Sequence, residues 1–311
     1  MKKSLGFLIV SLMFCLLAGF GPEAKADGPW PLIYDTAQHK WVEIGQVEAA
    51  LQQSQIVYVG EIHNHAWGHQ LELLLLEKFF AAHPNIAVAF EMFERDVQSV
   101  MDGYLAGQTT EEFFTNNSRP WGNYNTDYRP LVQFAQSYRL PVLAMNVPRR
   151  YAEYAAKGKD DSLWLMPATE KSFMAEKLLV LEGKYKQKFY ETMQNHVPPE
   201  IIERYYRAQC LKDDTMARSI VEFLKAHPDA GVISYTGAFH SDEYLGLVEK
   251  VALQMPALKL TLISIVPVTG DSVPDPESYG RLGDFIMFAP ESAKRQSPML
   301  DTVEEQLGLT K

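Results

Sequence analysis

The chain has 311 residues, of which 47% are hydrophobic, 12% aromatic and 22% charged. This length and composition are typical of a globular protein with a sizeable apolar core, and they argue against a largely disordered, collagen-like or disulfide-stapled chain. The 39 acidic residues outnumber the 29 lysines and arginines, so the formal net charge is −10 and nucleic acid is not an expected partner.

The N-terminal segment has the order of a secretory signal peptide. Two lysines precede an apolar run from Leu5 to Leu17, and small residues follow up to Ala26. The apolar run is shorter than the ~20 residues needed to span a bilayer. We therefore expect residues 1–26 to be a signal peptide that is cleaved after Ala26, so that the mature chain is exported to the periplasm, the cell envelope or the medium. The alternative is an uncleaved anchor.

The two cysteines bear on the same question. Cys15 lies within the expected signal peptide, so Cys210 has no intrachain disulfide partner once the signal is removed. A lipid anchor on Cys15 is not favoured, because the bulky Phe14 precedes it where a lipid-attachment site needs a small residue. We expect an exported chain that depends on neither a disulfide nor a lipid.

Beyond the leader, short β-branched apolar runs alternate with segments of helical periodicity. This pattern is typical of βαβ units and a mainly parallel sheet. The expected strands are Ile56–Gly60, Ile86–Met92, Pro141–Val147, Gly231–Gly237, Leu258–Val266 and Asp284–Phe288. Helices are expected at Trp67–Ala82, Tyr128–Tyr138 and Ser241–Gln254. The sequence therefore predicts an α/β fold whose mainly parallel central sheet is flanked by helices.

The strand pattern stops after Pro148 and resumes beyond Pro228. Between them, residues 168–195 and 199–226 have apolar residues at helical spacing and are expected to form two long helices. We interpret this region as a helical subdomain inserted into the α/β core. The expected organisation is a signal peptide, a single α/β domain, an inserted helical subdomain and a polar C-terminal tail, at residues 1–26, 27–290, about 151–230 and 291–311.

Polar side chains follow four of the predicted strands. Glu61 and His63 come at the end of the first strand, Glu91 ends the second, Arg149 follows the third and His240 follows the fourth. Ligands of open parallel sheets bind beyond the carboxyl ends of the strands, so we expect these side chains to converge. Each one alone is more often a hydrogen-bonded loop residue, but their coincidence favours a functional site.

The residue types at these strand ends suit a metal ion. Two histidines, His63 and His240, with the carboxylate of Glu91 or of Glu61 could bind a divalent transition metal and leave a coordination position open. The guanidinium of Arg149 could hold an anionic group or stabilise negative charge in a transition state.

Further candidates lie on the predicted helices. His65 and His69 are four residues apart at the start of the first helix and could face the same pocket, although either could equally cap or pack. Tyr205 and Tyr206 belong to an aromatic stripe in the helical insertion, a pattern more often found in a core. Tyr and His are nevertheless ligands that haem iron takes, so the insertion is a candidate lid over a flat apolar ligand.

Several segments between Gln55 and His240 together carry a family resemblance. They are YVGEIH at 58–63, FEMF at 90–93, WGNY at 121–124, YRPL at 128–131, LPVLAMNVPR at 140–149, AQ at 208–209, DTMA at 214–217 and TGAFH at 236–240, with His69 downstream of the first. In these segments the chain resembles the ChaN-type haem-binding proteins of the wider Tiki/TraB/erythromycin-esterase-like superfamily. The resemblance implies an α/β core with a helical subdomain, haem as the ligand, a role in iron uptake at the bacterial envelope, a haem-bridged homodimer and envelope haem-uptake components as partners.

The same resemblance bears on the metal site. The superfamily is built on two Gly-x-x-His motifs, a Glu and an Arg, which form a metal-dependent site in its hydrolytic branches. This implies His63, Glu91 and His240 as metal ligands and Arg149 as their electrostatic partner. The chain departs from the family in lacking a good lipid-attachment motif, and no single tyrosine can be matched to the iron-ligating position.

Two hypotheses follow. The favoured one is a non-catalytic, exported haem-binding protein whose haem contacts are drawn from His65, His69, Tyr205 and Tyr206. The alternative is a metal-dependent hydrolase, a peptidase or esterase. In that case Zn²⁺, Mn²⁺ or Co²⁺ is held by the two-histidine, one-glutamate set, Glu61 is the general base, and Arg149 stabilises the oxyanion.

Overall fold

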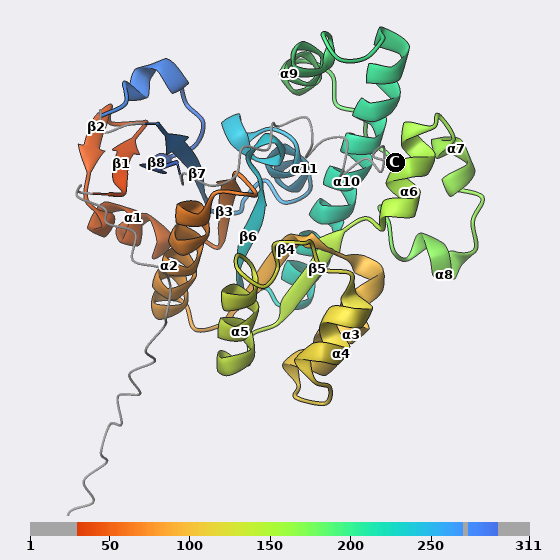
Figure 1. Cartoon of the computed structure of the whole chain (residues 1–311), viewed down its shortest axis with the longest axis horizontal. Helices are drawn as coiled ribbons and strands as arrows, with labels where there is room; N and C mark the ends of the chain where they lie inside the picture. The colour runs from red at the N-terminus through yellow and green to blue at the C-terminus, as the bar shows by residue number, and fades with distance from the viewer. Residues whose placement is uncertain (1–29, 270–272, 292–311) are drawn as a thin grey trace, which may run out of the picture.

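The computed structural model describes residues 30–269 and 273–291. The expected signal peptide and nearly all of the expected C-terminal tail lie outside these residues. The described chain forms an eight-stranded sheet in the order β2-β1-β8-β7-β3-β6-β4-β5, with helices packed on both faces (Figure 1). The predicted α/β class with a mainly parallel sheet is confirmed.

The six predicted strands are all present and pair in parallel. Their bounds are Ile56–Glu61 (β3), Ile86–Glu94 (β4), Val142–Asn146 (β5), Gly231–Gly237 (β6), Leu260–Val268 (β7) and Phe285–Pro290 (β8). Nearly all their residues are buried, because helices cover both faces of a parallel sheet. The sequence did not reveal β1 (Leu32–Asp35) and β2 (Lys40–Val42), which add to the β8 edge in antiparallel pairing.

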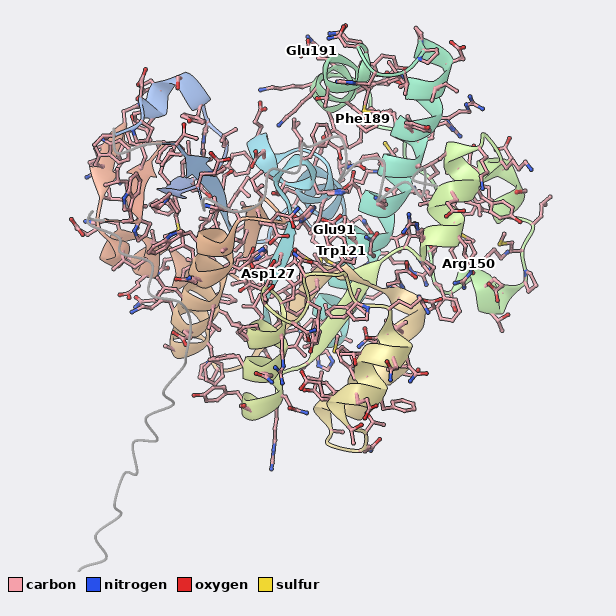
Figure 2. All side chains as sticks on the ribbon, in the orientation of Figure 1. Glu91, Trp121, Asp127, Arg150, Phe189 and Glu191 are labelled. Carbon is pink, nitrogen blue, oxygen red and sulfur yellow. The ribbon has the colours of Figure 1, made fainter. Side chains whose placement is uncertain are left out.

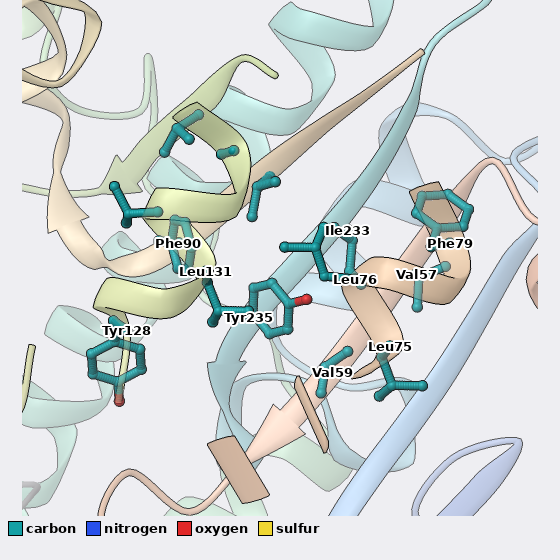
Figure 3. Packing of buried hydrophobic residues seen from close by; sticks show 14 of the residues in the cluster. Val57, Val59, Leu75, Leu76, Phe79, Phe90, Tyr128, Leu131, Ile233 and Tyr235 are labelled. Carbon is teal, nitrogen blue, oxygen red and sulfur yellow. The ribbon is translucent and has the colours of Figure 1, made fainter. Parts of the chain in front are cut away.

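Five helices pack on one face of the sheet or beside it. They are α1 (Ile44–Leu51), α2 (Ala66–Ala82), α3 (Gln98–Leu105), α4 (Glu111–Ser118) and α5 (Arg129–Tyr138). Figure 3 shows the sheet residues Phe90 and Tyr235 beside Leu131 of α5, and Phe79 of α2 near Val57 of β3. The Phe90 and Tyr235 rings stack at a centroid distance of 5.5 Å. All five side chains are fully buried, each contributing on the order of 1.5–3 kcal/mol of burial free energy.

The opposite face is covered by α10 (Pro199–Ala226) and α11 (Leu247–Gln254). Pro199 stands in the first turn of α10, where its missing N–H costs no helical hydrogen bond. The N-terminal half of α10 packs against helices that precede it in the chain, which Figure 1 shows on the side of the molecule away from β1 and β2. These are α6 (Arg149–Ala156), α7 (Asp160–Leu163), α8 (Ala168–Lys171) and α9 (Lys184–Met193).

Short 3-10 turns complete the described structure, at Arg95–Val97, Ala238–His240, Asp242–Tyr244 and Pro276–Tyr279. The helix expected over Ser241–Gln254 begins only at Leu247, because Glu243, Tyr244 and Gly246 have left-handed backbone conformations. Among the described residues, no helix is both long and apolar enough to cross a membrane.

The single long helix predicted over residues 168–195 is wrong. Only α8 and α9 are helical there, and residues 172–183 between them are not. Side chains of the neighbouring helices satisfy the backbone of this segment: the Leu179 N–H donates to Asp214 Oδ2, and the Leu179 carbonyl accepts from Lys250 Nζ, both at 2.7 Å. Periodicity alone could not reveal that hydrogen bonds from distant side chains, and not a helix, satisfy the backbone of this segment.

Candidate functional site

Two buried polar clusters lie at the carboxyl ends of the central strands. Strands β4, β5 and β6 lie on one side of β3, whereas β7 and β8 lie on the other, and such a reversal of strand order is where open α/β sheets bind ligands. The first, here the Glu61 cluster, comprises Glu61, His63, His69, Glu72 and Asp127. The second, here the His240 cluster, comprises Glu91, Gln209, Asp213, His240 and Tyr185.

Glu61 is the last residue of β3, and its two carboxylate oxygens have different partners. Its Oε1 accepts a hydrogen bond from the Tyr128 hydroxyl at 2.7 Å and lies 2.5 Å from His63 Nδ1. Its Oε2 lies 3.3 Å from His69 Nδ1. Although burial raises the pKa of Glu61, the neighbouring Glu72, His69 and His63 groups hold it well below its usual range. Glu61 is therefore the carboxylate that joins the two histidines.

The first two turns of α2 supply the other side of this cluster. His69 Nδ1 lies 2.9 Å from Glu72 Oε2, while His69 Nε2 lies 3.0 Å from the His63 carbonyl oxygen and 3.4 Å from Asp127 Oδ2. Burial lowers the pKa of His69, but the charges of Glu72 and Glu61 outweigh it and raise that pKa to about 10. Burial and the charge of Glu61 raise the pKa of Glu72 well above its usual range.

In the His240 cluster an imidazole lies between two carboxylates. His240 Nδ1 is 2.6 Å from Asp213 Oδ1, and His240 Nε2 is 3.2 Å from Glu91 Oε1. Burial lowers the pKa of His240, yet the charges of Glu91 and Asp213 raise it to about 10. The Tyr185 hydroxyl donates to the other oxygen of Asp213 at 2.7 Å, and Gln209 Nε2 lies 3.3 Å from both ring nitrogens of His240.

Gly237, the last residue of β6, brings the two clusters together. Its N–H donates to Glu91 Oε2 at 2.8 Å. A Cβ atom added at Gly237 would lie 2.8 Å from His63 Nε2 and 3.7 Å from Glu91 Oε2, so the imidazole packs directly against the glycine. The His63 and Trp121 rings also meet in a T-shaped arrangement at a centroid distance of 4.7 Å. Figure 2 shows Glu91, Trp121 and Asp127 grouped near the middle of the molecule.

Comparison with known proteins identifies the family. The sequence model of the family described as "Haem-binding uptake, Tiki superfamily, ChaN" matches residues 47–251, more than half of the chain. The chain belongs to this ChaN family. The match spans β3 through α11 and includes every residue of both clusters.

One solved structure agrees with this assignment at the level of the fold. ChaN of Campylobacter jejuni, described with cofacial haem binding, is 15% identical, covers 83% of this chain and 96% of its own, and has a TM-score of 0.61. The type III effector HopBA1 is 11% identical over 80% of this chain and 94% of its own, with a TM-score of 0.48. An erythromycin esterase mutant is 14% identical over 89% and 86%, with a TM-score of 0.47. None of the curated proteins matches the chain in sequence.

In this ChaN-family chain the structure brings together His63, Glu91 and His240, the residues predicted as metal ligands, around Gly237. It also places Glu61, the predicted general base, beside His63. Within the described part of the chain, however, the three side chains whose ligand atoms all lie within 4.8 Å of one another are Glu61, His69 and Glu72. The predicted metal set stays a prediction.

Other predicted residues lie outside the two clusters. Arg149 is in the exposed first turn of α6, with its Nε 3.6 Å from Glu153 Oε1. His65 precedes α2 and points to the end of β8, its Nε2 lying 2.8 Å from the Pro290 carbonyl oxygen. Thus His65 and His69 diverge, because the helix begins only after His65.

The two predicted tyrosines of α10 differ in exposure. Tyr205 is half-buried between two apolar clusters of the insertion. Tyr206 is fully buried, and its hydroxyl donates to the Leu181 carbonyl. Burial raises the pKa of Tyr206 well above its usual range, which disfavours the phenolate.

Sequence reasoning missed several members of the clusters. Glu72 lies three residues after His69, so their shared helix face was readable from the spacing. The sequence marked Tyr128 only as a member of the YRPL segment and gave it no role in a site. Asp213 and Tyr185 gave no such signal, because their contact with His240 depends on how α10 and α9 cross the sheet edge.

Proposed function

We propose that this chain is an exported haem-binding protein of the bacterial cell envelope that serves haem or iron acquisition. Membership of the ChaN family supports haem as the ligand, and the signal-peptide pattern of residues 1–26 supports export. The structural observation that carries the proposal is the partly exposed imidazole of His63, held between Glu61 and the ring of Trp121 at the carboxyl edge of the sheet.

The donor chemistry of this edge fits haem. Histidine and tyrosine are among the axial ligands that haem iron takes, and an aromatic ring offers a flat apolar surface to the porphyrin. An axial ligand has to reach the face of the porphyrin. His63 and Tyr205 are partly exposed, whereas His65, His69 and Tyr206 are buried. We therefore assign the iron contact to His63 or Tyr205.

Buried residues behind His63 orient it. The carboxylate of Glu61 fixes Nδ1 of the ring and makes the imidazole a stronger donor. His69 and Asn123 both bond to the backbone carbonyl of His63, at 3.0 and 2.7 Å. Bound haem would supply the iron that the protein carries, and the residues of this chain supply its position.

Titration of the purified chain with haemin tests the proposal. We expect a saturable shift of the Soret band that is lost or moved in His63→Ala or Tyr205→Phe, and unchanged in His196→Ala, which removes an exposed histidine before α10. A spectrum that stays that of free haem, or that responds to none of these variants, contradicts the proposal. Export is tested separately, because N-terminal sequencing of the mature protein should begin at Asp27.

The alternative function, a metal-dependent hydrolase, is favoured by one observation. His63, Glu91 and His240 approach one another around Gly237, and Glu91 Oε1 is buried without a hydrogen-bond partner among the described residues. A metal ion held there would act as a Lewis acid, and Glu61, the predicted general base, lies 2.5 Å from His63 Nδ1, where it would hold the ligating ring in position. Ester or peptide hydrolysis by the purified chain that disappears in Glu91→Gln would support this function.

A further inference from the structure

We propose that Glu61, His69 and Glu72 form a buried binding site for one small divalent transition-metal ion. This site is distinct from the predicted metal ligands His63, Glu91 and His240, and it does not depend on haem binding. The proposal follows from the hydrogen-bond partners of His69, from carboxylate oxygens left without partners among the described residues, and from the spacing of the ligand atoms.

The hydrogen bonds of His69 fix which ring nitrogen carries the proton. Its Nε2 faces the His63 carbonyl oxygen at 3.0 Å and Asp127 Oδ2 at 3.4 Å, and both of these atoms are acceptors. Because a carbonyl oxygen cannot donate, Nε2 holds the hydrogen and, in the neutral ring, Nδ1 presents its lone pair. Metal-binding histidines typically anchor their second nitrogen to a carbonyl or carboxylate in this way.

The lone pair of Nδ1 points at two carboxylates. Glu72 Oε2 is 2.9 Å away and Glu61 Oε2 is 3.3 Å away. A neutral imidazole nitrogen and two charged carboxylates would repel one another at these distances, so either protons or a bound cation must lie among them.

Unpartnered oxygens favour the cation. Glu61 Oε2 and Glu72 Oε1 are buried without a hydrogen-bond partner among the described residues, and both side chains are almost completely excluded from solvent, at 1% and 0% exposure. The ion pairs seen for Glu61, Glu72 and Asp127 all involve His63 or His69. A buried carboxylate oxygen without a partner costs free energy, and one cation in contact with both carboxylates would stabilise these oxygens together.

The spacing and support of the ligands also suit a metal ion. Ligand atoms of all three residues lie within 4.8 Å of one another. Ligands at about 2.1 Å from one ion are separated by roughly 3.0 to 4.2 Å, and the 2.9 and 3.3 Å separations of His69 Nδ1 from the two carboxylates are close to this range. The Tyr128 hydroxyl holds Glu61 Oε1 and leaves Oε2 for the ion. One imidazole with two carboxylates is a donor set for Mn²⁺, Fe²⁺ or Zn²⁺ rather than for Cu⁺.

Metal content of purified variants tests the proposal. The chain is produced in medium supplemented with Mn²⁺ or Zn²⁺, so that the ion is present while the buried site folds, and is then freed of loose metal and analysed. These two ions are chosen because iron brought by haem does not contribute to either signal. We expect about one ion per chain in the unaltered protein and in Glu77→Gln, which neutralises an exposed carboxylate on the same helix.

Glu72→Gln keeps the shape of the side chain but removes the ligand charge, and we expect its affinity for the ion to be at least tenfold weaker. Binding of the ion should raise the melting temperature of the unaltered chain, and this rise should be absent in Glu72→Gln. Glu61→Gln should have the same effect, which keeps the test decisive if one variant folds poorly. Glu91→Gln should retain the ion. Absence of stoichiometric Mn²⁺ and Zn²⁺ in the unaltered chain overturns the proposal, as does retention in both Glu72→Gln and Glu61→Gln. Loss in Glu91→Gln alone would overturn it by assigning the ion to the His240 cluster.

Discussion

Gly237→Ala is the substitution that most directly tests whether the two clusters meet as the structure shows. The added methyl group would lie 2.8 Å from His63 Nε2 and 2.9 Å from Cε1, whereas ordinary van der Waals contact begins at 3.4 Å. The imidazole must therefore move by about 0.6 Å. It is held on its other side by Glu61 at 2.5 Å and by Trp121, so it cannot move without disturbing one of them. Overpacking of this kind typically costs ~1–3 kcal/mol.

Urea unfolding and haemin titration measure the two consequences. We expect Gly237→Ala to lower the free energy of unfolding by this amount and to change the Soret spectrum or the affinity for haem. Gly45→Ala is the matched control, because nothing lies within 4 Å of the added methyl and the residue is in helix α1, where alanine is favoured by up to ~1 kcal/mol. If Gly237→Ala matches the unaltered protein in both stability and haem binding, His63 does not pack against β6 and the convergence of the clusters is refuted.

Three further substitutions test the electrostatics and capping of the fold. Burial raises the pKa of Asp242 to about 6, so its protonated form stabilises the folded state below pH 4 and that contribution is lost as the pH rises to about 6. Asp242→Asn keeps a hydrogen-bond acceptor for Ser264. Its free energy of unfolding should exceed that of the unaltered chain by up to ~3 kcal/mol at pH 7 and should be equal to it at pH 3.5, as measured by urea unfolding at the two pH values. Lys250→Met leaves Asp214 buried without its 2.7 Å partner and should cost ~3–5 kcal/mol by the same method. Thr110→Ala removes the side-chain cap of α4 and should cost ~1 kcal/mol, seen as a lower melting temperature.

The strands could be predicted from sequence because burial on both faces leaves a nearly continuous apolar run. β6, Gly231–Gly237, is buried at every position, and its bounds were predicted to the residue. β2, Lys40–Val42, could not be found, because it is three residues long, largely exposed, and held in place by pairing with β1. The failed helix over residues 168–195 has the same origin, since the contacts that shape it come from Asp214 and Lys250.

The candidate site could be predicted in part for a related reason. His63, Glu91 and His240 each lie within three residues of the carboxyl end of a strand, and parallel strands bring their carboxyl ends to one edge, so topology alone places these residues near one another. Asp213 reaches His240 from the middle of a 28-residue helix. Its position depends on the angle and register of α10 against the sheet, which local sequence does not encode.

Glu61 connects the haem proposal with the metal proposal. One of its oxygens is committed to His63 and Tyr128, and the other faces His69 and the proposed ion. A carboxylate that binds a divalent cation through one oxygen becomes a weaker acceptor at the other, so loading the buried site should weaken the hold of Glu61 on His63 Nδ1. The imidazole would then be a poorer donor toward haem iron. Saturation with Zn²⁺ should therefore lower haem affinity in the unaltered chain and have no effect in Glu72→Gln, whereas equal haem affinity with and without Zn²⁺ in the unaltered chain would show that Glu61 does not couple the two sites.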